Sequence, residues 1–216
     1  MQNSRARQSV TVLIADDHAV FAEALRSLLQ DEYVVLATVT DGRSLVEQTA
    51  KLRPQVLIID IAMPLLNGFD AAKRVLEQSP SVKVVFLTMQ EDARLAAAAL
   101  KLGPIGFVLK HSAASELLTA ISQVLAGRSY VTPRLRPRDW AVRDELASDL
   151  NKELTGRQRE VLQLLAEGRT MKEVAHVLNM SRKTVMFHKY RIMKTFNLKT
   201  NADILRLAIK NNLIPQ

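Results

Sequence analysis

The first 127 residues alternate between short apolar runs and amphipathic runs with helical spacing. Parallel strands need crossover connections, so this alternation is typical of a parallel sheet with helices on both faces. We predict a doubly wound α/β domain with a five-stranded parallel sheet. The predicted strands are Val10–Ala15, Val34–Val39, Gln55–Asp60, Lys83–Thr88 and Gly106–Leu109, and the predicted helices are Ala19–Gln30, Ser44–Lys51, Ala71–Gln78, Asp92–Leu102 and Ser115–Ala126.

The charge is divided unevenly between the two halves of the chain. Residues 1–127 hold 12 Lys and Arg against 13 Asp and Glu, whereas residues 128–216 hold 18 against 9. A near-neutral half joined to a strongly basic half predicts two domains, the second of which meets a polyanion. We expect an N-terminal tail at 1–9, the α/β domain at 10–127, a linker at 128–150 and a small all-α domain at 151–216. Within the linker, Asp139–Leu150 has a partial helical pattern.

Composition excludes several classes of protein. The chain has no cysteine, which rules out disulfides and thiolate metal sites. No apolar run approaches the roughly 18 residues of a membrane span. The first nine residues are polar and do not resemble a signal peptide. We therefore expect a cytoplasmic protein that does not associate with a membrane.

Polar residues follow the predicted strands at their carboxyl ends, where α/β proteins place reactive groups. The set comprises Asp16, Asp17, Asp60, Thr88 and Lys110. Any one of these could be an ordinary polar residue at a strand end, but their occurrence together favours a functional site. Three adjacent carboxylates repel one another, and oxygen ligands without Cys favour Mg²⁺. With Thr and Lys to hold phosphoryl oxygens, the set suits phosphoryl transfer to a carboxylate.

Two rival phosphate chemistries are less well supported. Four apolar residues followed by Asp60 resemble a Walker-B strand, but the chain has no Gly-x-x-x-x-Gly-Lys-Ser/Thr loop. A phosphohydrolase with an aspartyl-phosphate intermediate needs an acid or base that activates water. Ile61 and Ala62 follow Asp60, and neither can do this. His18 is compatible with a metal or catalytic role, although its position favours an ordinary surface residue at a helix start.

The basic half shows helical periodicity only. Its predicted helices are Gly156–Glu167, Met171–Leu178, Arg182–Phe196 and Asn201–Asn211. The second and third are short and separated by about three residues, which is the spacing of a helix-turn-helix motif. Ser181 is a favourable N-cap, and the helix after it would enter the major groove of DNA.

Helical spacing places Val185, Ile192 and Phe196 toward the core of this domain. The outward residues then divide by chemistry. Met186 and Phe187 are candidates for base contacts, with Tyr190 a weaker one, although all three are compatible with ordinary packing. His188 is either a phosphate contact or solvated. The remaining candidates for DNA contact are Lys183 and Thr184, together with Arg182, Lys189, Arg191 and Lys194, whose cations would bind phosphates.

Residues 10–127 resemble the receiver domain of two-component response regulators, which has a flavodoxin-like fold. The matching elements are Asp16-Asp17, Asp60 followed by Met63-Pro64 and Asn67-Gly68, Thr88, and Gly106 to Lys110. The resemblance implies that Asp60 is the phosphoacceptor. It also implies that Asp16, Asp17, Asp60 and the backbone carbonyl of Ala62 hold Mg²⁺, that Thr88 and Lys110 sense the phosphoryl group, and that Phe107 is an aromatic switch that turns inward.

Residues 154–214 resemble the DNA-binding domain of the LuxR/FixJ (NarL-type) family. The two resemblances imply a transcription regulator, not an enzyme, activated when a partner histidine kinase phosphorylates Asp60. They also imply a homodimer on double-stranded DNA with paired half-sites, dimerised through Asn201–Asn211. An alternative is a phosphorylation-independent DNA-binding regulator whose receiver serves as a protein-interaction module.

Overall fold

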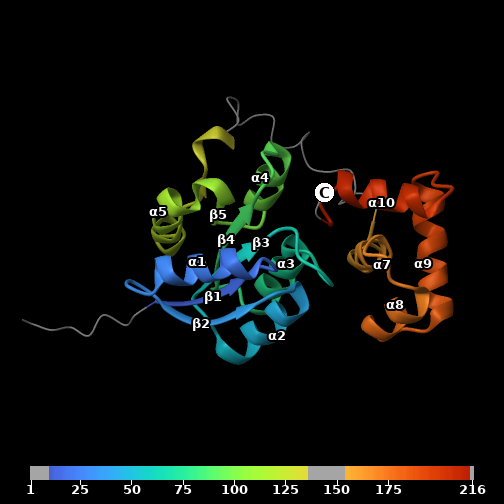
Figure 1. Cartoon of the computed structure of the whole chain (residues 1–216), viewed down its shortest axis with the longest axis horizontal. Coiled ribbons are helices and arrows are strands. Elements are labelled where there is room, and N and C mark those ends of the chain that lie inside the picture. The colour runs from blue at the N-terminus through green and yellow to red at the C-terminus, as the bar shows by residue number, and fades with distance from the viewer. Residues whose placement is uncertain (1–9, 136–153, 215–216) are drawn as a thin grey trace, which may run out of the picture.

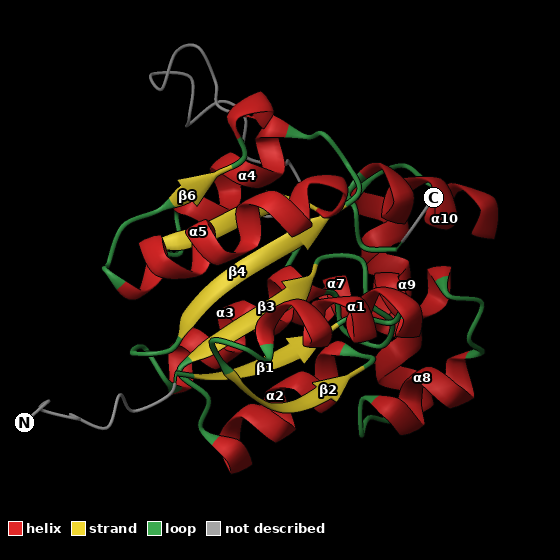
Figure 2. Ribbon diagram, turned by 60° about the vertical axis from the view of Figure 1, so that its left-hand side comes forward, coloured by secondary structure: helices red, strands yellow, loops and turns green. Residues whose placement is uncertain are grey.

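The computed structural model describes residues 10–135 and 154–214 (Figures 1 and 2). Its first part is a parallel sheet of six strands in the order β2-β1-β3-β4-β5-β6. This confirms the predicted doubly wound α/β fold. The strands are β1 (Thr11–Ala15), β2 (Val34–Val39), β3 (Val56–Asp60), β4 (Lys83–Thr88), β5 (Ile105–Leu109) and β6 (Tyr130–Val131).

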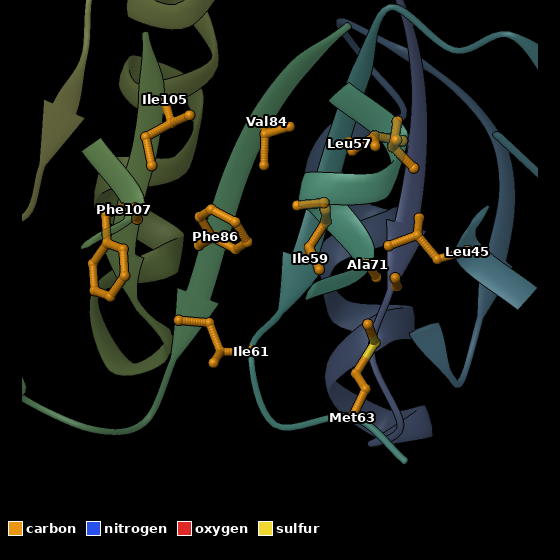
Figure 3. Close-up of a cluster of buried hydrophobic side chains, with 14 of the residues drawn as sticks. Leu45, Leu57, Ile59, Ile61, Met63, Ala71, Val84, Phe86, Ile105 and Phe107 are labelled. Carbon is orange, nitrogen blue, oxygen red and sulfur yellow. The ribbon is translucent and has the colours of Figure 1, made fainter. Parts of the chain in front are cut away.

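Helices cover both faces of the sheet, as Figure 2 shows. On one face lie α1 (Ala19–Leu29) and α5 (Ala113–Leu125), and on the other lie α2 (Gly42–Leu52), α3 (Gly68–Gln78) and α4 (Ala93–Leu100). Side chains alternate along each strand, so the buried sheet supplies two separate apolar cores. The core under α2, α3 and α4 contains Ile59, Phe86 and Phe107, which point into one layer in Figure 3.

The sheet has a sixth strand where the sequence analysis predicted the start of the linker. Tyr130 and Val131 pair in parallel with Gly106 and Phe107 of β5. Thr132 continues the contact, because its backbone N–H donates to the Phe107 carbonyl at 2.9 Å. A two-residue strand is too short to show alternation, so periodicity could not reveal it. A 3₁₀ turn at Pro133–Leu135 follows. The helix predicted at Asp139–Leu150 lies outside the described residues.

The start of α3 fixes the end of β3. Asn67 caps the helix, its side-chain oxygen accepting from the Asp70 N–H at 2.9 Å. The helix therefore begins at Gly68, earlier than the predicted Ala71. A Cβ at Gly68 would lie 2.0 Å from the carbonyl oxygen of Asp60, so only glycine allows this close approach.

The second part of the chain is all helical, as predicted. It consists of α7 (Gly156–Ala166), α8 (Met171–Val177), α9 (Arg182–Thr195) and α10 (Asn201–Lys210). Thr155, Thr170, Ser181 and Thr200 cap the four helices through side-chain oxygens. The turn between α8 and α9 contains Asn179 at φ 51°, a left-handed conformation that asparagine tolerates. Within the described residues, no helix has the length and apolar character needed to span a membrane.

Candidate phosphoacceptor site and nucleic-acid interface

The carboxyl ends of β1, β3 and β5 bring three charged groups together. Lys110 Nζ lies 2.6 Å from Asp60 Oδ2 and 2.7 Å from Asp16 Oδ2. All three side chains are almost completely buried. The predicted convergence of Asp16, Asp60 and Lys110 is therefore present, and one ammonium group bridges two carboxylates.

Burial controls the protonation of this cluster. It raises the pKa of Asp60, and the adjacent Lys110 only partly offsets that effect. Burial alone would lower the pKa of Lys110, but the Asp60 and Asp16 carboxylates outweigh burial and raise it. Lys110 therefore stays cationic at neutral pH. The site retains more negative than positive charge when its acids are ionised, which favours an additional cation.

The acidic residues form a pocket that is compatible with a divalent cation. Ligand atoms of Asp16, Asp17, His18 and Asp60 all lie within 4.8 Å of one another, the only such group found in the described parts of the chain. Carboxylate oxygens at this spacing suit a hard cation such as Mg²⁺. His18 is exposed, but its Nδ1 lies 2.9 Å from Asp17 Oδ1. The position of His18 at a helix start predicted a surface residue, and no sequence pattern indicated this proximity to Asp17.

Thr88 ends β4 at the same edge of the sheet and is buried. Its hydroxyl accepts from the Gln90 N–H at 3.1 Å. Phe107 is fully buried, with its ring 6.4 Å from that of Phe86 (Figure 3). The ring of Phe107 therefore lies in the core of the sheet's helix-covered face, where it packs beside Phe86.

Helix α9 presents an apolar and basic surface. Met186, Phe187 and Tyr190 are 55%, 53% and 63% exposed, whereas Val185 and Ile192 are buried, as the spacing predicted. Arg191 lies over the Phe187 ring, with 5.3 Å between its guanidinium carbon and the ring centroid. Large exposed apolar side chains beside cations match a surface that contacts base edges and phosphates. Arg182, Lys183 and Lys194 are also exposed.

Two of the predicted DNA contacts have hydrogen-bond partners within the chain, and a third is partly buried. Lys189 Nζ donates to Asn201 Oδ1 at 2.9 Å. Thr184 Oγ1 lies 2.8 Å from Ser181 Oγ, within the cap of α9. His188 is half-buried, and burial together with the nearby positive charge of Arg157 lowers its pKa. Lys189 and His188 are thus less available to DNA than the exposed side chains of α9, whereas Thr184 is itself exposed.

Comparison with known proteins matches each part of the chain to a protein family. The model of the response regulator receiver domain matches residues 12–122, and the model of bacterial regulatory proteins of the luxR family matches residues 152–208. The chain belongs to the NarL-type response regulators. It is a response regulator with a LuxR-type DNA-binding domain, a class of transcription regulators rather than enzymes.

Similar proteins span nearly the whole response regulator. The oxygen regulatory protein NreC of Staphylococcus epidermidis is 35% identical over 214 residues, covering 94% of this chain and 98% of that one. The transcriptional regulatory protein DegU of Brevibacillus brevis is 29% identical, covering 95% of each chain. A structure of the RcsB response regulator of Salmonella typhimurium has a TM-score of 0.64 at 26% identity, covering 96% of this chain and 99% of that one.

The response regulator also contains a contact between its two domains that no sequence pattern predicted. Arg159 of α7 makes a buried ion pair with Asp70 of α3, with Nη2 2.7 Å from Oδ1. Glu160 of α7 pairs with Arg43 and Arg74 of the receiver. Gln163, on the same helix, is completely buried. The only sequence signal was the run of polar residues within α7, which also suits a solvated helix face.

Proposed function

We propose that this response regulator is activated when a partner histidine kinase phosphorylates Asp60, and that it then binds paired DNA half-sites as a homodimer. The supporting observation is the buried cluster in which Lys110 bridges Asp60 and Asp16 beside Asp17. Double-stranded DNA as the partner supports the proposal that the regulator acts in the cytoplasm. We also propose that the receiver begins at residue 10 and extends through β6, beyond the predicted boundary at 127, and that the DNA-binding domain spans residues 151–216.

The chemistry follows from the residues at the sheet edge. A carboxylate oxygen of Asp60 attacks phosphorus, and the bond from phosphorus to the donor nitrogen or acyl oxygen breaks, so that an acyl phosphate remains on Asp60. Asp16, Asp17, Asp60 and the Ala62 carbonyl would hold Mg²⁺, which neutralises phosphoryl charge. Lys110 would transfer its ion pair from Asp60 to the phosphoryl oxygens, and Thr88 would donate its hydroxyl to them.

In the second domain, α9 is the proposed recognition helix. Its exposed Met186 and Phe187 would contact base edges, and its basic side chains would grip phosphates. Support comes from RcsB of Salmonella enterica serovar Typhimurium, described as bound to a promoter in the presence of the phosphomimetic BeF₃⁻. That structure has a TM-score of 0.60 at 28% identity, and the alignment covers 95% of this chain and 98% of that one.

The direct test measures the affinity of the protein for genomic DNA fragments, with and without acetyl phosphate plus Mg²⁺. We expect phosphorylated protein to bind selected fragments at least about tenfold more tightly, a difference of about 1.4 kcal/mol. Asp60→Asn should give the same weak binding in both conditions. Equal binding by the wild type with and without phosphodonor would refute activation by phosphorylation.

Phe187→Ala should weaken specific DNA binding more than non-specific binding. A lost base contact costs about 1–3 kcal/mol, so we expect operator affinity to fall by about tenfold. Affinity for random DNA should change little, because phosphate contacts carry it. Parallel fluorescence anisotropy titrations on the two DNAs measure the difference. Met89→Ala, at a receiver residue that is 68% exposed, is the matched control. Equal losses of affinity for operator and random DNA would mean that Phe187 only packs within the domain and does not contact bases.

The exposure of α9 favours a second candidate function. Met186, Phe187 and Tyr190 are open to solvent while α7 contacts the receiver. A regulator that binds its operator without phosphorylation, with the receiver as a protein-interaction module, would have this property. Operator binding by Asp60→Asn as tight as that of the phosphorylated wild type would select this function.

A further inference from the structure

A buried polar side chain directly after β6 reaches the neighbourhood of the phosphoacceptor site, although the composition of this stretch predicted a linker. Thr132 is 1% exposed. Its hydroxyl accepts from the Leu109 N–H at 3.1 Å and donates to Glu116 Oε2 at 2.7 Å. Leu109 ends β5 directly before Lys110, and Glu116 lies in the first turn of α5. One hydroxyl therefore holds both ends of the junction that carries Lys110.

The Thr132 hydroxyl takes the place of a backbone acceptor. Strand β6 forms the edge of the sheet and pairs with β5 (Figure 2). In a regular parallel ladder, the Leu109 N–H would donate to a backbone carbonyl of the neighbouring strand. The Thr132 carbonyl instead accepts from the Leu135 N–H at 2.9 Å, in the 3₁₀ turn that follows. A buried N–H without a partner costs free energy, so the side chain supplies the acceptor that the turn withdraws.

Glu116 orients that hydroxyl. A carboxylate accepts hydrogen bonds and donates none, so the Thr132 proton points to Glu116 and an oxygen lone pair remains for the Leu109 N–H. Glu116 Oε2 also accepts from the Tyr130 hydroxyl at 3.1 Å. A negative charge in the first turn of α5 is further stabilised by the helix dipole. Each hydrogen bond in the set thus has a defined donor and acceptor.

The junction matters because the ammonium of Lys110 is shared between several groups. Nζ lies 2.6 Å from Asp60 Oδ2, 2.7 Å from Asp16 Oδ2 and 4.8 Å from the centroid of the Phe21 ring. In the proposed reaction this ammonium moves to the phosphoryl oxygens. A charged group is effective in such a site only when the structure around it fixes its geometry closely. The same ammonium repels a cation that binds the two carboxylates.

We propose that Thr132, oriented by Glu116, is a positioning residue that places Lys110 at the phosphoacceptor site. Loss of the hydroxyl loosens the junction between β5 and α5, so that Nζ no longer lies against both carboxylates. Phosphorylation of Asp60 then slows, because the ammonium is less well placed to neutralise phosphoryl charge. Mg²⁺ binds more tightly, because a competing positive charge has moved away. The inference rests on the proposed role of Asp60 as phosphoacceptor.

The experiment compares full-length wild type with Thr132→Val, Thr132→Ser and the control Thr49→Val. Valine keeps the shape of threonine without its hydroxyl, whereas serine keeps the hydroxyl. Thr49 of α2 is also buried, but its hydroxyl has no hydrogen-bond partner among the described residues. The initial rate of labelling by acetyl phosphate with Mg²⁺ is measured, and Mg²⁺ affinity is measured by calorimetry without phosphodonor. We expect Thr132→Val to label about fivefold more slowly and to bind Mg²⁺ about threefold more tightly, with Thr132→Ser and Thr49→Val close to the wild type.

A double-mutant cycle tests whether Thr132 acts through Lys110. Thr132→Val is combined with Lys110→Ala, and the Mg²⁺ affinities of the wild type, both single variants and the double variant are compared. We expect Thr132→Val to have no further effect once the ammonium is absent. An equal effect in both backgrounds would mean that the hydroxyl acts on the acidic residues without Lys110, and it would overturn the proposal.

A purely structural role for Thr132 would lower thermal stability and either weaken both labelling and Mg²⁺ binding or change neither, and each of these results would overturn the proposal. Glu116→Ala removes the acceptor of the Thr132 hydroxyl at a half-buried position and should shift both measurements in the same directions as Thr132→Val. It decides the case if Thr132→Val does not fold. If the wild type itself accepts no label, the proposed function fails. The Mg²⁺ titrations then still decide the placement of Lys110, because unchanged affinity refutes it and tighter binding supports it.

Discussion

Asp60→Asn is expected to reduce labelling by ³²P-acetyl phosphate to background. The amide has nearly the same shape as the carboxylate but lacks its nucleophilic oxygen anion and the charge that would help to hold Mg²⁺. The folded protein should tolerate the change. Burial raises the pKa of Asp60, so the fold already disfavours the charged form relative to a solvated carboxylate. Lys110 also retains its ion pair with Asp16 at 2.7 Å.

Asp31→Asn is the matched control, because Asp31 is an exposed carboxylate in the turn after α1. It should be labelled at the wild-type rate. Circular dichroism must show that both variants are folded. Label retained by folded Asp60→Asn at the wild-type level would mean that another group accepts the phosphoryl, and the adjacent Asp16 and Asp17 would be the first candidates.

The sequence predicted the sheet and its acidic edge for a simple physical reason. A strand buried on both faces must be apolar along its length, so a polar residue at its end is conspicuous. Asp60 after Val56–Ile59 and Lys110 after Phe107–Leu109 are such residues, and parallel strands bring them to one edge. Locally encoded features were predicted equally well, including the capping of α9 by Ser181.

The features that the sequence did not reveal depend on contacts between distant segments. Gln163 and Asn67 are 96 residues apart, and nothing in either local pattern indicates that they meet. β6 is too short for periodicity and exists because β5 offers an unpaired edge. Lys189 has the charge expected of a phosphate ligand, yet its ammonium group donates a hydrogen bond to Asn201 of α10. Such partners are fixed by tertiary packing rather than by propensity.

Gly68→Ala should cost about 3 kcal/mol of unfolding free energy, the upper part of the usual range for overpacking. An added Cβ would lie 2.0 Å from the Asp60 carbonyl oxygen and 2.7 Å from Ile59 Cγ2. The first of these is backbone at the end of β3, so the clash cannot be relieved by rotating a side chain. Urea denaturation followed by far-UV circular dichroism measures the loss.

Gly156→Ala is the matched control, because Gly156 and Gly68 each occupy the first position of a helix behind a capping residue. A Cβ at Gly156 would meet only Arg159 Nη2, at 3.7 Å, which is ordinary van der Waals contact. Replacing a helical glycine by alanine there should be neutral or stabilise by up to about 1 kcal/mol. Equal effects at the two glycines would contradict the close approach of α3 to β3. A loss confined to Gly68 would show that the end of β3, and with it Asp60, is held by the start of α3.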